Sequence, residues 1–256
     1  MSHQEPVARD DLPTVIAVAA LAICTTAVAH EAFGHGSVCL ALGGHITLLT
    51  NAYFRCSAYS SLIDIGGPVG NLIIGLIALV ASRLIAPSRP LLRFYAVCVA
   101  GFSLYWEAGY AIFSMLHGRG DYFGAWTGLI GPADWPVRIG VMVAGAVAYV
   151  VITKVLALSL SGFASRPGRI PRLLRPAWIT SVVVMGASAS LYAPDRLAAM
   201  HDAALSAAAA IPFLFRYSGL AASGNPASAI QRSQPALVAG VIVVAAFALL
   251  MGRGLY

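Results

Sequence analysis

The stretch TVIAVAALAICTTAVAHEAFGHGSVCLAL, residues 14–42, is apolar almost throughout, yet it contains His30, Glu31 and His35. It is longer than the roughly 20 mostly apolar residues that an α-helix needs to cross the hydrocarbon core of a bilayer. A charged side chain inside such a helix costs about 2.5–3.5 kcal/mol on insertion scales. The stretch therefore predicts a membrane-spanning helix whose polar residues need a partner, water or a metal ion.

The rest of the chain has the same apolar character. Of its 256 residues, 59% are hydrophobic and 10% are charged, and the mean hydropathy is +0.81. Soluble domains carry about 25% charged residues. Further spans are predicted at residues 61–86, 91–116, 136–158, 177–192 and 235–251. The sequence therefore predicts an all-α, polytopic transmembrane helix bundle with about six spans.

One later stretch, residues 196–220, is apolar but interrupted. Asp202, Pro212 and Arg216 break its apolar run. These interruptions favour an interfacial or re-entrant segment over a seventh span.

Basic residues predict which loops face the cytoplasm. The formal net charge is +6, and all basic side chains except Lys154 are arginines. Arginines gather in residues 83–93 and 166–175, the loops after the second and fourth predicted spans, and the positive-inside rule makes such loops cytoplasmic. With six spans, both termini are then cytoplasmic. The outer connections are residues 43–60, 117–135 and 193–234.

These features predict the location and the broad class of partner. We expect an integral, multi-pass protein of a bacterial inner membrane, with the lipid bilayer around it. No basic tract is dense enough for a nucleic-acid surface, so we expect no nucleic-acid partner. The sequence does not predict the oligomeric state.

The four cysteines show no C-x-x-C spacing that would indicate a redox or metal motif. Free buried thiols at Cys24, Cys39, Cys56 and Cys98 are the prediction. A Cys39–Cys56 bridge is the alternative.

The polar residues of the first span have the composition of a zinc site. Imidazole and carboxylate groups bind zinc well, and a catalytic zinc keeps three protein ligands and one open position. The zinc signature H-E-x-x-H places its histidines four residues apart. His30 and His35 are five apart, which on a regular helix separates them by about 140° around the axis.

A local change in the helix can remove this difficulty. A single extra residue is accommodated by a π-helical turn, and such turns favour functional sites. Gly34 and Gly36 weaken the α-helix at the required place. We therefore predict i→i+5 hydrogen bonding near residues 30–36, which would let both histidines reach one metal ion.

Two alternatives remain for these residues. The histidines can be buried polar groups that hydrogen-bond to neighbouring helices. Glu31 and His35, four apart on one helix face, can instead belong to a carboxylate-bridged metal pair, although no second E-x-x-H partner is present.

With these motifs, the sequence resembles the site-2 protease family of intramembrane zinc metalloproteases. The resemblance is carried by HEAFGHGSVCLALGG (30–44), GGPVGN (66–71) and GRGDYFGAW (118–126), within about residues 25–130. The family shows His-Glu-x-x-His with a small-residue helix and Gly-Gly, then Gly-Pro-x-x-Asn, then an aspartate ligand on a later span. The resemblance implies a metal-binding core of three membrane helices at residues 1–130, and additional transmembrane helices of unknown role at residues 131–256.

The resemblance also implies roles for individual residues. Glu31 would activate a water molecule. The Zn²⁺ ligands would be His30, His35 and Asp121. A broken helix beside the substrate would be shaped by Gly67, Pro68 and Asn71. Two features mark a divergent member: the extra residue between the histidines, and the absence of the family's Asn-Pro-x-x-x-x-Asp-Gly around Asp121.

The residues alone leave the third ligand open. Asp121 is the first choice, and Glu107 is the second because an unpaired carboxylate inside a span needs a reason. Asp64, His117 and Asp134 are further candidates. Asp121 can instead cap the next helix, and Glu107 can hydrogen-bond to a neighbouring span. Gly66 and Gly70 form a G-x-x-x-G, which also serves helix packing alone.

The predicted function is an intramembrane zinc metalloendopeptidase that cleaves membrane-embedded or membrane-adjacent peptide segments. Its substrate would be a membrane protein or peptide. The alternative is a non-catalytic membrane scaffold or a metal transporter of the same architecture, because transporters also hold histidines and acids at mid-membrane.

Overall fold

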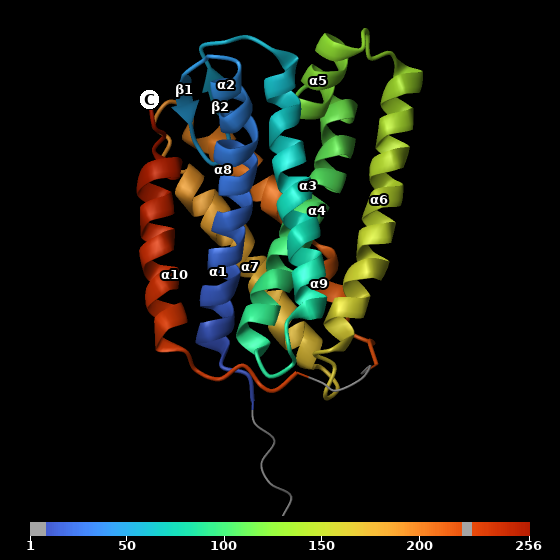
Figure 1. Cartoon of the computed structure of the whole chain (residues 1–256), viewed down its shortest axis with the longest axis vertical. Helices are drawn as coiled ribbons and strands as arrows, with labels where there is room; N and C mark the ends of the chain where they lie inside the picture. The colour runs from blue at the N-terminus through green and yellow to red at the C-terminus, as the bar shows by residue number, and fades with distance from the viewer. Residues whose placement is uncertain (1–8, 222–226) are drawn as a thin grey trace, which may run out of the picture.

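The computed structural model describes residues 9–221 and 227–256 as a bundle of long helices with one small sheet (Figure 1). The first helix, α1 (Leu12–Val28), begins where the Asp11 side chain accepts hydrogen bonds from the Thr14 backbone N–H and hydroxyl. It continues without a break through a π-helical segment, η1 (Ala29–Gly36), into α2 (Ser37–Ala41). The predicted first span is thus one continuous helical rod.

The other elements follow in chain order. The strands are β1 (Ile46–Leu49) and β2 (Phe54–Cys56). The remaining helices are α3 (Ser61–Leu84), α4 (Pro90–His117), α5 (Asp121–Leu129), α6 (Trp135–Ser161), α7 (Arg169–Ala189), α8 (Arg196–Ala208), α9 (Pro212–Phe215) and α10 (Gln234–Phe247), which ends in a second π-helical segment, Ala248–Gly252. The all-α prediction is confirmed.

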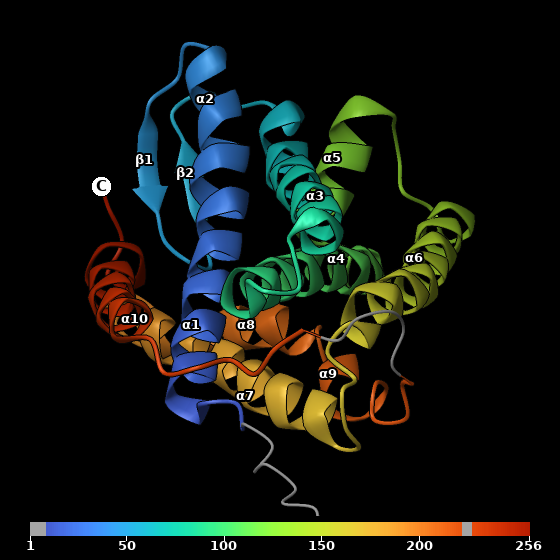
Figure 2. The ribbon, with the colours of Figure 1, turned by 60° about the horizontal axis from the view of Figure 1, so that its bottom comes forward.

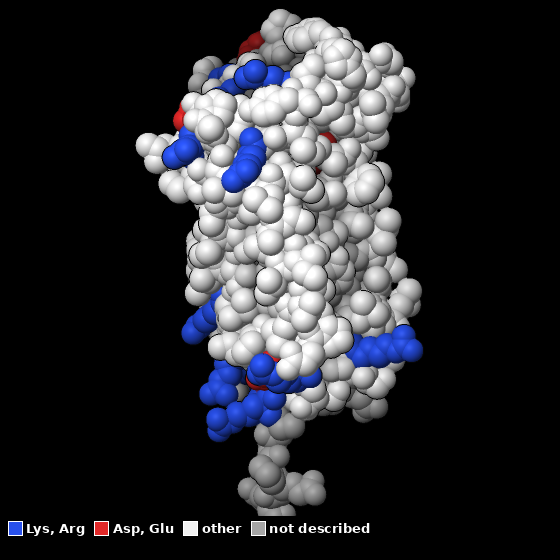
Figure 3. Space-filling view, turned by 90° about the vertical axis from the view of Figure 1, so that its left-hand side faces the viewer, with Lys and Arg blue, Asp and Glu red and all other residues white. Residues whose placement is uncertain are grey.

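Five helices in the described part of the chain are long and apolar enough to cross a membrane. They are Leu12–Ala41, Ser61–Leu84, Pro90–His117, Trp135–Ser161 and Gln234–Gly252. Lysine and arginine gather at the two ends of the molecule, and a broad uncharged band separates them (Figure 3). A band of this kind suits contact with lipid tails, and the protein is an integral membrane protein.

The span predicted at residues 177–192 differs most from the structure. It corresponds to α7, which starts at Arg169 and carries Arg172 and Arg175 in its first two turns. These charges keep α7 out of the set of apolar helices, although it packs within the bundle against α1 and α8.

The interrupted stretch at residues 196–220 packs within the bundle. Its first helix, α8, lies between α4 and α7 (Figure 2). Its Phe213 side chain is buried against Gly101 of α4, and Arg175 near the start of α7 donates to the carbonyl oxygen of Leu214. The segment therefore returns through the bundle as a broken helical passage.

This passage changes the position of the C-terminus. The Asp11 backbone N–H donates to the Ile230 carbonyl at the end where α1 begins, the lower end in Figure 1. Leu255 pairs with Leu49 of the hairpin, at the opposite, upper end. The start of α1 and the C-terminal residues thus lie at opposite ends of the bundle, because the chain makes one more passage than the six spans predicted from sequence.

The hairpin at the upper end is tied to the first helical rod. Strands β1 and β2 pair antiparallel, with Leu49 opposite Phe54. A disulfide joins Cys39 of α2 to Cys56 of β2, while Cys24 and Cys98 are free and buried. The prediction of four free thiols is thus wrong for this pair, because the hairpin folds back over α2.

Small residues let α3 approach the π-helical segment closely. A Cβ on Gly34 would lie 2.6 Å from both the Gly66 oxygen and the Gly67 Cα, and a Cβ on Gly70 would lie 2.6 Å from the Ala29 oxygen. Any side chain at these positions would push the helices apart. This contact brings the histidines of the first rod against α3.

Candidate metal centre

The π-helical segment puts the two histidines on one face of the rod. Segment η1 covers eight residues, Ala29–Gly36, so the predicted i→i+5 segment near residues 30–36 is confirmed. Residues five apart lie almost one above the other when the hydrogen bonds run i→i+5. The rings of His30 and His35 accordingly lie edge to face, with centroids 4.9 Å apart.

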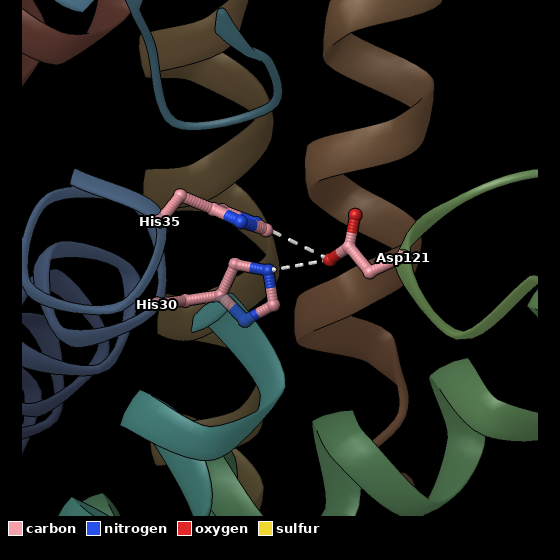
Figure 4. A group of neighbouring side chains, drawn as sticks. All are labelled: His30, His35 and Asp121. Atoms are coloured by element: carbon pink, nitrogen blue, oxygen red, sulfur yellow. Dashed lines mark hydrogen bonds and ion pairs between the residues drawn. The ribbon is translucent and has the colours of Figure 1, made fainter. Parts of the chain in front are cut away.

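Both rings point toward Asp121 (Figure 4). His30 Nε2 lies 3.1 Å and His35 Nε2 lies 3.3 Å from the same oxygen, Asp121 Oδ2. One ligand atom from each residue fits within 4.8 Å of the others. Of the candidate third ligands, Asp121 is therefore the one that meets both histidines.

The other ring nitrogens face oxygen atoms. His30 Nδ1 lies 3.1 Å from Glu107 Oε1, and His35 Nδ1 lies 2.6 Å from the Ile63 carbonyl oxygen. His30 Nδ1 also lies 3.3 Å from the Asn71 amide nitrogen, but that nitrogen donates to Glu107 Oε1 at the shorter distance of 2.8 Å. A carbonyl or carboxylate oxygen only accepts, so each Nδ1 donates and each neutral ring keeps its lone pair on Nε2. The lone pairs of the two Nε2 atoms and of Asp121 Oδ2 then point at one another. Only a proton or a metal cation between them can offset their repulsion.

Packing fixes the two rings in place. His30 stacks on Trp106 with ring centroids 4.9 Å apart, and His35 stacks on Phe54 at 5.3 Å. Gly67 of α3 lies directly beside the ring nitrogens, since a Cβ there would collide with Nε2 of both histidines. Any larger residue at Gly67 would displace the donor atoms.

Glu107 supports His30 from the side away from Asp121. Its carboxylate accepts from the Asn71 amide at 2.8 Å, from the Tyr122 hydroxyl at 3.1 Å and from His30 Nδ1. A carboxylate behind a histidine fixes the ring's tautomer and raises its basicity in metal sites. The buried Glu107 is thus explained by its contact with His30 and not by membership of the ligand group.

Asp121 is positioned by a glycine turn. It is the first residue of α5, and the preceding Gly120 has φ +86°, a left-handed conformation that favours glycine. The Asp121 side chain does not cap α5. Burial raises the pKa of its carboxyl, but the His30 and His35 rings, which donate to Oδ2 when they carry a second proton, outweigh burial and hold that pKa well below its usual range.

Glu31 is buried beside the two histidines. Its residue is 4% exposed, and it lines a cavity of about 890 Å³ that also reaches His30, His35 and Asp121. Among the described residues, its carboxylate has no hydrogen-bond partner. Glu31 is therefore free to act on a molecule in the cavity.

The remaining candidate ligands lie elsewhere. His117 Nδ1 donates to the Phe113 carbonyl oxygen at the end of α4. Asp134 is exposed before α6, and Asp64 lines the cavity without joining the ligand group.

The residues expected beside the substrate lie behind the site. Gly67, Pro68 and Asn71 are all buried, and none of them lines the cavity. Gly67 packs against the imidazoles, and Asn71 holds Glu107. Their substrate-binding role stays a prediction, and the contacts assign them to support of the histidines.

Sequence reasoning missed much of the cavity wall. The hairpin contributes residues 51–56, and α8 and the turn after it contribute Asp202, Leu205 and Ser206 among others. The interruption of the apolar run by Asp202 was the available signal. The cavity therefore draws on both sides of the predicted division at residue 130, which itself stays a prediction.

Comparison of the chain with protein-family models, with curated proteins and with solved structures returned no match.

Proposed function

We propose that the protein is an intramembrane zinc metalloendopeptidase. The observation that carries the proposal is the convergence of His30 Nε2, His35 Nε2 and Asp121 Oδ2, with both Nδ1 atoms held as donors by other groups. Separations of 3.1 and 3.3 Å suit a tetrahedral ion about 2.0–2.2 Å from each atom. Two imidazoles and one carboxylate form a ligand set that zinc accepts while keeping one position open.

Glu31 would serve as the general base. When bound, a divalent ion such as zinc would polarise the peptide carbonyl and lower the pKa of a water molecule to about 7. Glu31 would take a proton from that water while the water oxygen adds to the carbonyl carbon of the peptide bond. Glu31 would then deliver the proton to the amine nitrogen as the C–N bond breaks. The Glu31 carboxylate, which lines the cavity and makes no hydrogen bond to the described residues, supports this role.

The substrate would be a peptide segment embedded in, or next to, the membrane. The cavity of about 890 Å³ is large enough for several residues of an extended chain, and it lies among helices that face lipid. Its walls include the hairpin as well as α4 and α8. A membrane-protein or peptide substrate is therefore the class that the proposal names.

We further infer that the upper end faces the periplasm of a bacterial inner membrane. Disulfides persist in oxidising compartments, and the Cys39–Cys56 bridge lies at the same end as the site. The arginine-rich segments at residues 83–93 and 166–175 join α3 to α4 and α6 to α7 at the lower end in Figure 1, which the positive-inside rule makes cytoplasmic. The N-terminus would then be cytoplasmic and the C-terminus periplasmic.

Metal analysis and cleavage together test the function. Purified wild-type protein should contain about one zinc per chain, and His35→Ala should lose it. Glu31→Gln should keep the metal and lose cleavage of apolar membrane peptides in detergent micelles. His117→Ala is the matched control, because this histidine lies outside the ligand group and should change neither value.

Two results would contradict the proposal. If wild-type protein holds no divalent ion after purification in the presence of zinc, the proposed metal site is contradicted. If the Glu31→Gln variant cleaves as fast as wild type, the role of Glu31 as general base is contradicted. Metal flux through the protein in vesicles, lost in His35→Ala, would instead favour the transporter alternative.

A further inference from the structure

Four carboxylates lie at or near the candidate metal centre, and three of them have an assigned role. Glu107 accepts three hydrogen bonds, Asp121 joins the two histidines, and Glu31 is the proposed base. Asp64 is the fourth. Its charge needs a separate explanation.

Asp64 is half-buried in the first turns of α3 and lines the cavity. Its Oδ2 lies where Gly124 of α5 leaves room, because a Cβ on Gly124 would come within 2.6 Å of it. Within the described residues, it has neither a hydrogen bond nor an ion pair. The α3 dipole favours an acid in this turn, but it supplies no donor for the carboxylate.

The charge of the cavity points to a cation beyond the metal. Asp64 interacts electrostatically with the like charge of Asp121 and, in the opposite sense, with His35. Glu31, 4% exposed and without a hydrogen bond to any described residue, faces the same cavity. A divalent ion held by His30, His35 and Asp121 would leave Asp64 without a cation of its own, and a half-buried carboxylate without a hydrogen-bond partner is costly.

The cavity wall also suits a cationic group. Its aromatic rings include Tyr53, Phe54, Trp106, Tyr110, Phe113 and Tyr149. Aromatic faces attract ammonium and guanidinium groups, the more so where water is excluded. Among the basic residues of the wall, Arg55 and Arg119 are exposed at the surface and do not pair with Asp64.

We propose that Asp64 binds a lysine or arginine side chain of the substrate segment, close to the peptide bond that is cleaved. The cleavage in this statement rests on the proposed function, but the recognition of the cation by Asp64 does not. Asp64 is thus a specificity-determining residue, and the substrate class narrows to membrane segments that carry a basic residue.

The test uses peptides that differ by one charge. Each is a labelled, N-acetylated and C-amidated segment of alanine and leucine with a single lysine, moved one position at a time. A matched set has norleucine in place of lysine, and a third set has glutamate. Binding is measured by fluorescence anisotropy on the full-length protein in detergent, and cleavage is followed in the same samples by mass spectrometry.

At one or more registers, the lysine peptide should bind wild-type protein about tenfold more tightly than its norleucine match, the size of a charge-assisted hydrogen bond. The glutamate peptide should bind most weakly, and this comparison needs no variant. Asp64→Asn should reduce the lysine preference to about one while keeping the metal. Asp134→Asn is the matched control, since it removes an exposed acid near the same end and should leave the preference unchanged.

The possible failures are distinct. Cleavage without any lysine preference would overturn this inference and leave the endopeptidase proposal standing. Lysine-selective binding that depends on Asp64, without cleavage of any peptide, would contradict the endopeptidase proposal and leave this inference standing. Loss of zinc in Asp64→Asn would make Asp64 a metal ligand and overturn its role in specificity.

Discussion

The two ends of the bundle each bury a charged cluster, and the clusters are built in opposite ways. The lower cluster centres on Arg169, which is 2% exposed. Its five N–H groups are all used: two bind the Asp10 carboxylate at 2.8–2.9 Å, and three bind Ser165 Oγ and the carbonyl oxygens of Ala227 and Ser228. Asp10 therefore lies in a closed network of donors and acceptors.

The upper cluster consists of His30, His35, Glu107 and Asp121, and it is incomplete by the same accounting. Oxygen acceptors hold the Nδ1–H groups of the two rings from behind. When the rings are neutral, two Nε2 atoms and one carboxylate oxygen therefore face each other with no hydrogen between them. A closed cluster fixes chain segments to one another. An open cluster of acceptors creates a demand for a cation, which is how a buried polar group becomes a binding site.

The largest expected effect is a loss of folding stability when the lower cluster is broken. Arg169→Met removes the two-fold hydrogen-bonded partner of Asp10 and leaves only the longer Arg166 contact at 3.6 Å, and breaking a buried ion pair in this way costs about 3–5 kcal/mol. Chemical unfolding in detergent should show that loss. Metal content per folded chain should stay unchanged. A variant that folds normally but loses its zinc would show that the clusters are coupled, and the contrast drawn here would fail.

The disulfide gives the next largest effect, because it joins the hairpin to α2 covalently at the upper end. Replacing both Cys39 and Cys56 by serine opens a link of 17 residues, and a loop of about that size contributes about 3 kcal/mol. Unfolding of the double variant should begin at a correspondingly lower denaturant concentration. Treatment of wild type with dithiothreitol should reproduce the shift, and no change with either treatment would contradict the bridge.

The contrast also shows what the sequence can and cannot predict. The spans were predictable because each rests on a local apolar run, and η1 because the spacing of His30 and His35 demanded it. Asp121 came from the family resemblance, and the structure brings it to both histidines. Local patterns and one motif were therefore enough to predict the three candidate ligands.

The long-range features were not predictable in this way. Arg169 reads as a loop charge in sequence, and its burial depends on Asp10, 159 residues away. The return of the chain through α8 depends on packing of Phe213 against Gly101. The same is true of the hairpin wall, whose place follows from the Cys39–Cys56 bridge.

A smaller effect tests whether Glu107 acts through His30. Glu107→Gln keeps the shape but removes the charge that supports His30 Nδ1. Zinc affinity should fall about 10–100-fold, as for other carboxylates behind histidine ligands. Competition with a zinc-binding dye measures it. A complete loss of metal would instead make Glu107 a ligand in its own right.

The smallest effect lies one contact further from the metal. The Tyr122 hydroxyl donates to Glu107 Oε2 at 3.1 Å, while Asn71 and His30 bind the other oxygen. Tyr122→Phe removes one donor of three and keeps the volume of the ring. Because a single hydrogen bond contributes about 1 kcal/mol net, zinc affinity should fall only about fivefold.

The matched control for this change is Tyr95→Phe, which removes a hydroxyl bonded to Thr25, away from the metal centre. It should affect stability to a similar degree and leave zinc affinity unaltered. Equal loss of zinc affinity in both variants would mean that the effect reflects general loosening of the bundle. A graded series from Glu107→Gln to Tyr122→Phe to Tyr95→Phe would instead show that the open cluster is held by contacts whose influence declines with distance from the metal.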